Sequence, residues 1–280
     1  AVNVSQVATI AIVALGMTLV IASGGIDLSV GAVMAVAGAL APLVFLSPWA
    51  LANPGLGLAA SLLLPLLAAA ACGLFNGVLI AFLGVQPIIA TLIFFISGRG
   101  IAQVLTSGNL QTFTNPDFAW IGTGRILGLP LQGWLALGLT VILSLVVRRT
   151  VYGRQLLAVG GNERAAALAG VPVARVKIAT YMIAAVLAGV AGLIVVAINS
   201  ASDAARIGQL MELDAIAAAV VGGTVLTGGR APVFGTALGA VFIQLMGYTL
   251  IANGVPDEAT LIVTAAIIVV AVWLQSGRRV

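Results

Sequence analysis

Apolar stretches of about 20 residues recur along the whole of this 280-residue chain, and they constrain its fold more than any other feature. A helix of that length crosses the roughly 30 Å hydrocarbon layer of a bilayer and satisfies its backbone hydrogen bonds internally. The runs are continuously apolar rather than alternating, which excludes a strand-based barrel. We therefore predict an all-α, polytopic helical membrane protein.

We expect nine apolar segments, separated by connectors that are rich in Pro, Gly, Asn and charged residues. They cover residues 6–22, 29–46, 57–83, 87–104, 130–147, 178–200, 213–227, 232–252 and 260–275. Together they would form one transmembrane domain over residues 1–280. Residues 1–6 have no basic region, so the first segment does not resemble a signal peptide, and the span count from the basic loop described below places residue 1 outside. We therefore expect that one N-terminal span is missing.

Composition removes several classes of function. Charged residues make up 7% of the chain, against about 25% in soluble domains, so a water-soluble globule is excluded. The chain has no His and one Cys, which removes the usual zinc, haem and Cys-His catalytic sets. We therefore predict neither an enzyme nor a metal site. Six of the twelve basic residues gather in one loop, a distribution that does not favour nucleic-acid binding.

That loop, residues 148–177, sets the predicted orientation. It carries six basic residues and one acidic residue, and short basic loops stay on the cytoplasmic side. Counting spans from it places residues 200–212 outside and residues 228–230 inside, with Arg278 and Arg279 also inside. The acidic residues in or beside the outer loops either hydrate those loops or form a docking face for a soluble partner. They are Asp117, Asp203, Glu212, Asp214, Asp257 and Glu258.

A glycine-rich interruption at residues 24–31 (GGIDLSVG) places a carboxylate inside an apolar stretch. An isolated Asp at the centre of a membrane helix costs about 2.5–3.5 kcal/mol, so Asp27 should face a polar cavity or a partner. Gly24 and Gly25 permit a broken helix. Asp27 or Ser29 would then cap a helix or close a tight turn, or would contact a solute directly.

A second interruption at residues 222–229 (GGTVLTGG) repeats this pattern about 200 residues later. Gly222 and Gly223 would break a second helix, and the similarity suggests an internal duplication with the solute route between its halves.

Polar side chains also interrupt the apolar spans. In a bilayer they either bond neighbouring helices together or line a route for a hydroxyl-rich solute. They are Asn76, Gln86, Thr91, Arg99, Gln103 and Gln244.

The basic loop contains the pattern of a short surface helix. Asn162 is a good N-cap, residues 163–168 favour helix, and Gly170 followed by Pro172 is a helix stop. The loop either serves only to fix topology or acts as a lever that inserts into a cytosolic partner.

These motifs resemble the membrane subunits of bacterial ATP-binding-cassette (ABC) importers for monosaccharides of the ribose, galactose and xylose type. The resemblance rests on residues 14–21 (ALGMTLVI), 24–31, 158–162 (AVGGN), 212–216 (ELDAI) and 228–230 (GGR). Within that family the chain is similar to galactofuranose importer permeases at residues 86–87, 90–93 and 98–100, and at Asp117 and Trp120.

The resemblance implies roles for particular residues and partners. The permease itself would bind no cofactor, and ATP and Mg would be held by two separate ATPase subunits. A second permease subunit and a periplasmic sugar-binding protein would complete the complex in the inner membrane, in contact with lipid. The residues of the coupling helix that contacts the ATPase would be Gly160, Asn162, Glu163, Arg164, Ala165, Ala166 and Gly170. The resemblance also implies that the route is flanked by Asp27 and Ser29 and by the glycine pairs Gly24, Gly25 and Gly222, Gly223. From the polar residues in the apolar spans we add Asn76, Gln86, Thr91, Arg99 and Gln244 to the predicted route.

The sequence therefore predicts a monosaccharide permease that alternates its access under the control of a separate ATPase. An ion-coupled secondary transporter that uses Asp27 as its proton or sodium site is the main alternative. A non-transporting scaffold or an intramembrane enzyme is a third, disfavoured by the missing catalytic sets.

Overall fold

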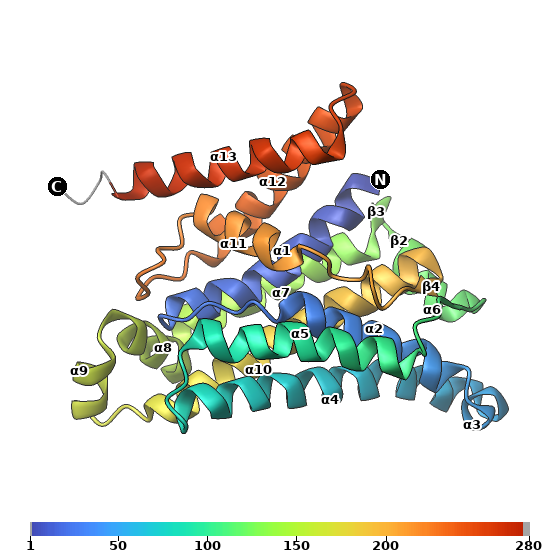
Figure 1. The fold of residues 1–280 in the computed structure, drawn as a ribbon, viewed down its shortest axis with the longest axis horizontal. Helices are drawn as coiled ribbons and strands as arrows, with labels where there is room; N and C mark the ends of the chain where they lie inside the picture. Colours follow the sequence, from blue (N-terminus) through green and yellow to red (C-terminus); the bar gives the residue numbers. More distant parts are fainter. Residues whose placement is uncertain (1, 277–280) are drawn as a thin grey trace.

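The computed structural model describes residues 2–276, and its long helices run roughly along one direction (Figure 1). Helices α8 (Val151–Gly161) and α9 (Glu163–Leu168) lie at one end, the α9 end. Helices α3 (Pro48–Ala52) and α6 (Pro116–Thr123) lie at the other with the short strands, the strand end. Six helices in the described part are long and apolar enough to cross a membrane, which confirms the all-α, polytopic prediction.

Each of the nine predicted apolar segments contains a helix, all of them within residues 2–276. These helices are α1 (Val2–Ala22), α2 (Val30–Phe45), α4 (Pro54–Ala81), α5 (Pro87–Leu105), α7 (Leu131–Arg149), α10 (Val173–Asn199), α11 (Met211–Val221), α12 (Val233–Ala252) and α13 (Asp257–Ser276). Arg278 and Arg279, for which we predict a cytoplasmic position, lie outside the described residues.

Helices α1, α2 and α10 form the centre of the molecule, and small residues allow their backbones to approach closely. A Cβ at Gly16 of α1 would lie 2.9 Å from the Cα of Ala184, and one at Gly192 of α10 would lie 3.0 Å from the Cα of Met34. Close packing of this kind is typical of membrane helices, where water provides no drive to bury apolar surface between them. The outer helices expose large aliphatic side chains instead, such as Leu67 at 64% exposure.

The strand end joins two connectors that we predict on the same side of the membrane. Strand β1 (Gln111–Thr112) pairs antiparallel with β4 (Ala201–Ser202), with Gln111 opposite Ser202. Strands β2 (Arg125–Ile126) and β3 (Leu129–Pro130) form a second antiparallel pair. The pairing of β1 with β4 agrees with the parity of the predicted spans.

Helix α11 is shorter than the predicted segment 213–227. It ends at Val221 because Gly222 follows as its C-cap and Gly223 adopts a φ of 95°. Its 11 residues rise about 16 Å, roughly half the thickness of the hydrocarbon layer. Residues 222–229 continue without helix to the α9 end, so the segment crosses as a half-helix and a loop.

Two acidic residues predicted in or beside an outer loop belong instead to the first turn of α11. Glu212 is 5% exposed, because it faces the buried side of this half-helix rather than water. Asp214 is half-buried on the same helix. Neither side chain is therefore available to a docking face in the way that the loop assignment implies.

Candidate functional site

The connection between α1 and α2 forms a tight turn around Asp27. One carboxylate oxygen, Oδ1, accepts a hydrogen bond of 2.8 Å from the backbone N–H of Ser29 and another of 2.6 Å from its hydroxyl. Gly24 takes a φ of 85°, which a residue with a side chain rarely adopts. Ser29 occupies the N-cap position of α2, but its hydroxyl caps no backbone group there. Of the local interpretations, the tight turn therefore describes Asp27, and the expected side-chain cap at Ser29 is wrong.

Helices α4 and α5 hold this turn. Asn76 of α4 donates a hydrogen bond of 2.9 Å to the hydroxyl of Ser29. The backbone N–H of Leu28 donates to Thr91 of α5 at 3.1 Å. Asp27, Ser29, Asn76 and Thr91 are all at most 1% exposed. The structure thus joins four of the predicted pathway residues in one buried polar network.

The second glycine-rich break packs against α12. A Cβ at Gly222 would lie 2.5 Å from the Cα of Thr236, so the two segments touch through their backbones. The hydroxyl of Thr236 lies 2.6 Å from that of Thr18 and 3.4 Å from that of Thr224. These three buried threonines link α1, α12 and the break. Sequence reasoning missed them, since single threonines are common in apolar helices and none of the three stands out.

Both breaks meet the basic loop at the α9 end. The N–H of Gly229 donates a hydrogen bond of 2.9 Å to the carbonyl of Ala22, the last residue of α1. A Cβ at Gly160, in the last turn of α8, would overlap that same carbonyl oxygen. A Cβ at Gly228 would lie 3.1 Å from the backbone nitrogen of Gly24. The contact also places residues 228–230 on the side of the basic loop, as the span count predicts.

The short surface helix forms where the sequence predicts it. Helix α9 begins after Asn162, whose side chain accepts a hydrogen bond of 3.0 Å from the N–H of Ala165. It ends before Gly170, which adopts a φ of 79°. Arg164 and Ala165 are exposed, while Ala166 is 6% exposed and packs against the core. The N-cap and the helix stop are therefore confirmed.

Two polar contacts fasten the basic loop to α10. Lys177 of α10 donates to both carboxylate oxygens of Glu163 at 2.7 Å. The phenol of Tyr152 in α8 lies 2.9 Å from the hydroxyl of Thr180. Burial raises the pKa of the Tyr152 phenol to about 12, so the phenol stays protonated and this contact persists at neutral pH. Movement of α9 would therefore be passed to α10.

A cavity of about 250 Å³ lies between the first break, the end of α8 and α10. Its lining includes Gly24, Gly25, Gly160 and Lys177. The hydroxyl of Tyr181 also lines it, is buried, and has no hydrogen-bond partner among the described residues. Two motifs that we predict separately, the first break and the basic loop, thus enclose one polar space together with Tyr181 of α10.

Arg99 has a different position from the network around Asp27. Its Nη1 donates to the carbonyls of Ala204, Ala205 and Ile207 at 3.0–3.3 Å. These carbonyls belong to the irregular segment before α11, and the carboxylate of Glu212 provides the nearby opposite charge. Arg99 therefore holds the irregular segment before α11 in place.

The remaining predicted pathway residues are scattered. Gln86 is exposed at the start of α5 and caps no backbone group with its side chain. Gln244 of α12 donates a hydrogen bond of 2.9 Å to Gln6 of α1. Gln103 is exposed near the end of α5. The predicted set thus divides between the network at Asp27, the two breaks, the Arg99 contact and the Gln244 contact, while Gln86 belongs to none of them. The role of the set in translocation stays a prediction.

Comparison with known proteins identifies the family. Residues 3–272 match the family model described as the permease component of the branched-chain amino acid transport system. The chain belongs to this permease family. The permease is thus a multi-pass membrane transport protein and not an enzyme.

Three curated relatives are informative. The permease is 41% identical to the galactofuranose transporter permease protein YtfT of Escherichia coli K12, covering 98% of this chain and 78% of that protein. It is 39% identical to the fructose import permease protein FruF of Bifidobacterium longum, over 95% of this chain and 74% of that protein. It is also 39% identical to the ribose import permease protein RbsC of Escherichia coli K12, over 98% of this chain and 84% of that protein. No solved structure matches the chain. These relatives support the permease prediction and give no support to the ion-coupled alternative.

Proposed function

We propose that this permease is the membrane-spanning subunit of an ATP-driven ABC importer that moves a monosaccharide across the bacterial inner membrane. The names of its relatives, which are permeases for galactofuranose, fructose and ribose, support a sugar as the solute. Galactofuranose is the first sugar to test, because the relative at 41% identity transports it. A periplasmic sugar-binding protein would deliver the solute, and a second permease subunit would complete the route.

Helix α9 is the observation that carries this proposal. It is capped at Asn162, tied to α10 through Glu163, and it presents Leu168 at 90% exposure. An aliphatic side chain that points outward from a capped helix on a cytoplasmic loop offers an anchor that the groove of a partner can bury. Two ATPase subunits that hold ATP and Mg would supply that cover, one for each permease subunit.

The test is retention of the ATPase by a variant of α9. Burial of Leu168 in a partner groove would contribute about 1.5–3 kcal/mol, so Leu168→Asp should weaken ATPase binding at least tenfold. Leu127→Asp is the matched control, since Leu127 is 88% exposed but lies in the turn between β2 and β3 at the strand end. We expect ATPase to co-purify with Leu127→Asp and not with Leu168→Asp. Equal co-purification would contradict the proposal.

The ion pair at the base of α9 provides a second test. Glu163→Arg places a second cation beside Lys177 and should reduce ATP-driven uptake into vesicles while membrane insertion stays normal. The exchange of both charges, Glu163→Lys with Lys177→Glu, restores the pair. We expect this double variant to regain uptake, because the pair sets how α9 sits on α10. Unchanged uptake by Glu163→Arg would show that the contact of α9 with α10 does not transmit movement from the ATPase.

A further inference from the structure

A separate polar cavity of about 310 Å³ lies in the half of the molecule nearer the strand end, between α1, α10, α11 and α12. Its polar lining comes from Gln6, Thr9, Asn199, Asp214 and Gln244, and the rest is aliphatic or Met. Gln6 precedes the last residue of α1 by 16 positions, which corresponds to about 24 Å along the helix. The cavity is therefore well separated from the α9 end and from the breaks.

The two acidic residues of α11 point in opposite directions. Glu212 faces Gly31, where an added Cβ would lie 2.7 Å from its Oε2, and it has Arg99 as its nearby cation. Asp214 follows two residues later, about 200° further around the helix, and lines the cavity. Its carboxylate makes no hydrogen bond or ion pair with any described residue. Glu212 thus has a nearby cation, although its Oε2 has no hydrogen-bond partner among the described residues, while Asp214 presents an acceptor to the cavity.

We propose that this cavity is a binding site for a neutral, hydroxyl-rich solute. This proposal rests on the proposed function, and the cavity would be the first site in the permease that the sugar occupies. Adjacent hydroxyls of a monosaccharide can donate to the carboxylate of Asp214, and the amides of Gln6, Asn199 and Gln244 can donate or accept. About 310 Å³ matches the lower end of the volumes of small-molecule sites.

The lining also selects against anionic solutes. No cationic side chain is among the residues that line this cavity, all of which lie in the described part of the chain. A sugar phosphate would place a second anion beside Asp214 without a counter-charge, and the carboxylate of an amino acid such as leucine would meet no cationic side chain in the lining. The cavity therefore favours a sugar over the amino acids named in the family description.

Helix association alone does not account for the cavity. The hydrogen bond of 2.9 Å between Gln244 and Gln6 would serve to join α12 to α1. Asp214 has no such role, because its carboxylate forms no hydrogen bond or ion pair with a described residue. An unpartnered charge in a membrane segment is costly. A hydroxyl-rich solute provides the missing donors.

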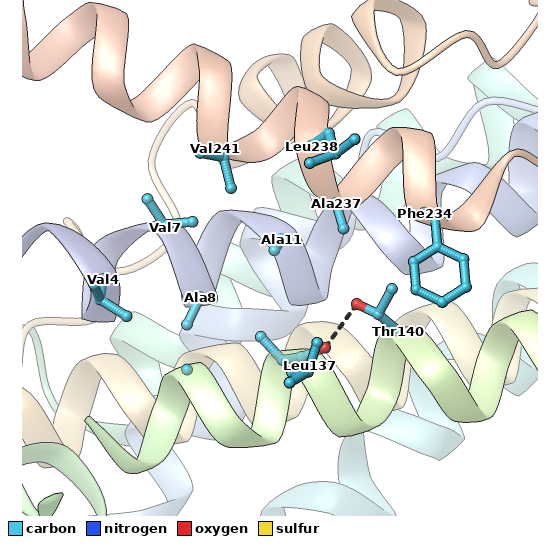
Figure 2. A pocket seen from close by; sticks show the side chains of 12 residues that line it. Val4, Val7, Ala8, Ala11, Leu137, Thr140, Phe234, Ala237, Leu238 and Val241 are labelled. Carbon is cyan, nitrogen blue, oxygen red and sulfur yellow. Dashed lines mark hydrogen bonds between the residues drawn. The ribbon is translucent and has the colours of Figure 1, made fainter. Parts of the chain in front are cut away.

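The cavity in Figure 2 is a contrasting space on the other side of α1 and α12, of about 340 Å³. It is lined by aliphatic residues such as Val7 and Val241 and by Phe234, and its one hydroxyl, at Thr140, is bonded within its own helix to the carbonyl of Ala136. Val241 lies one turn from Gln244 on α12. The pair therefore offers matched positions in an apolar and a polar cavity.

Cysteine labelling tests the proposal in the complete complex reconstituted in vesicles. With the only native cysteine replaced by Cys72→Ala, a single cysteine is introduced by Gln244→Cys or, as the control, Val241→Cys. A sulfonated methanethiosulfonate reagent should label the first and not the second. D-galactose, D-ribose or D-fructose at ten times its dissociation constant should slow labelling of Gln244→Cys about tenfold, and L-leucine should not.

Asp214→Asn provides the second variant. Because a hydrogen bond to a charged group is stronger than one to a neutral amide, we expect the sugar concentration for half-protection to rise about tenfold. Protection by leucine equal to that by sugar, no protection by any sugar, or equal labelling of Val241→Cys would each overturn the binding site. If ATP-driven sugar uptake by the unaltered complex is intact in those cases, the proposed function survives; if no sugar moves, the proposed function is what fails.

Discussion

The contact of Gly160 with the end of α1 leads to a specific prediction about Gly160→Ala. The added Cβ would overlap the carbonyl oxygen of Ala22 and would approach the nitrogen of Gly229 to 2.7 Å. Both neighbours are backbone, and they share a hydrogen bond of 2.9 Å, so neither can move aside as a flexible side chain would.

The expected loss in the free energy of unfolding combines the cost of overpacking and the cost of the distorted hydrogen bond. Overpacking in a closely packed region costs about 1–3 kcal/mol, and a lost or distorted buried hydrogen bond costs about 1 kcal/mol more. A total of about 2–4 kcal/mol corresponds to a fall of roughly 5–15 °C in melting temperature for a chain of this size. Gly161→Ala is the matched control, because a Cβ at Gly161 meets no atom within 4 Å.

The assay is thermal unfolding of the purified variants in detergent, followed by ATP-driven uptake in vesicles. We expect Gly160→Ala to unfold at a lower temperature than Gly161→Ala and to lose uptake, because α8 is forced away from both glycine breaks. If the two variants unfold at the same temperature, the close junction of the basic loop with the breaks is refuted.

Two further predictions concern buried polar contacts. Arg99→Met removes the donor to three carbonyls, which should cost about 1.5–3 kcal/mol and reduce the yield of folded protein in size-exclusion chromatography. A normal yield would show that the segment before α11 does not need this arginine. Thr236→Val keeps the volume but removes the hydroxyl that lies between those of Thr18 and Thr224, and should lower the melting temperature by an amount equivalent to about 1–3 kcal/mol; an unchanged melting temperature would mean that these hydroxyls do not stabilise the contact.

The local features of the fold were predictable because they depend on nearby residues. Long apolar runs indicate the helices, Asn162 and Gly170 mark the two ends of α9, and the glycine pairs mark the breaks. The exception is the length of α11, where the apolar composition of residues 213–227 concealed a helix end at Val221. Composition reports what a bilayer tolerates, whereas the backbone at Gly222 and Gly223 decides where helix stops.

The amino-acid sequence by itself determined that this is a polytopic helical membrane protein with a capped helix on a basic loop, because hydrophobicity and helix capping depend on residues that are close in the chain. Tertiary structure alone decided which polar groups meet. Asn76 reaches Ser29 across 47 positions, Gly160 touches both breaks, and Asp214 faces a cavity while Glu212 faces away from it. Such contacts depend on how helices rotate and cross when their small residues pack, and no local pattern specifies that arrangement.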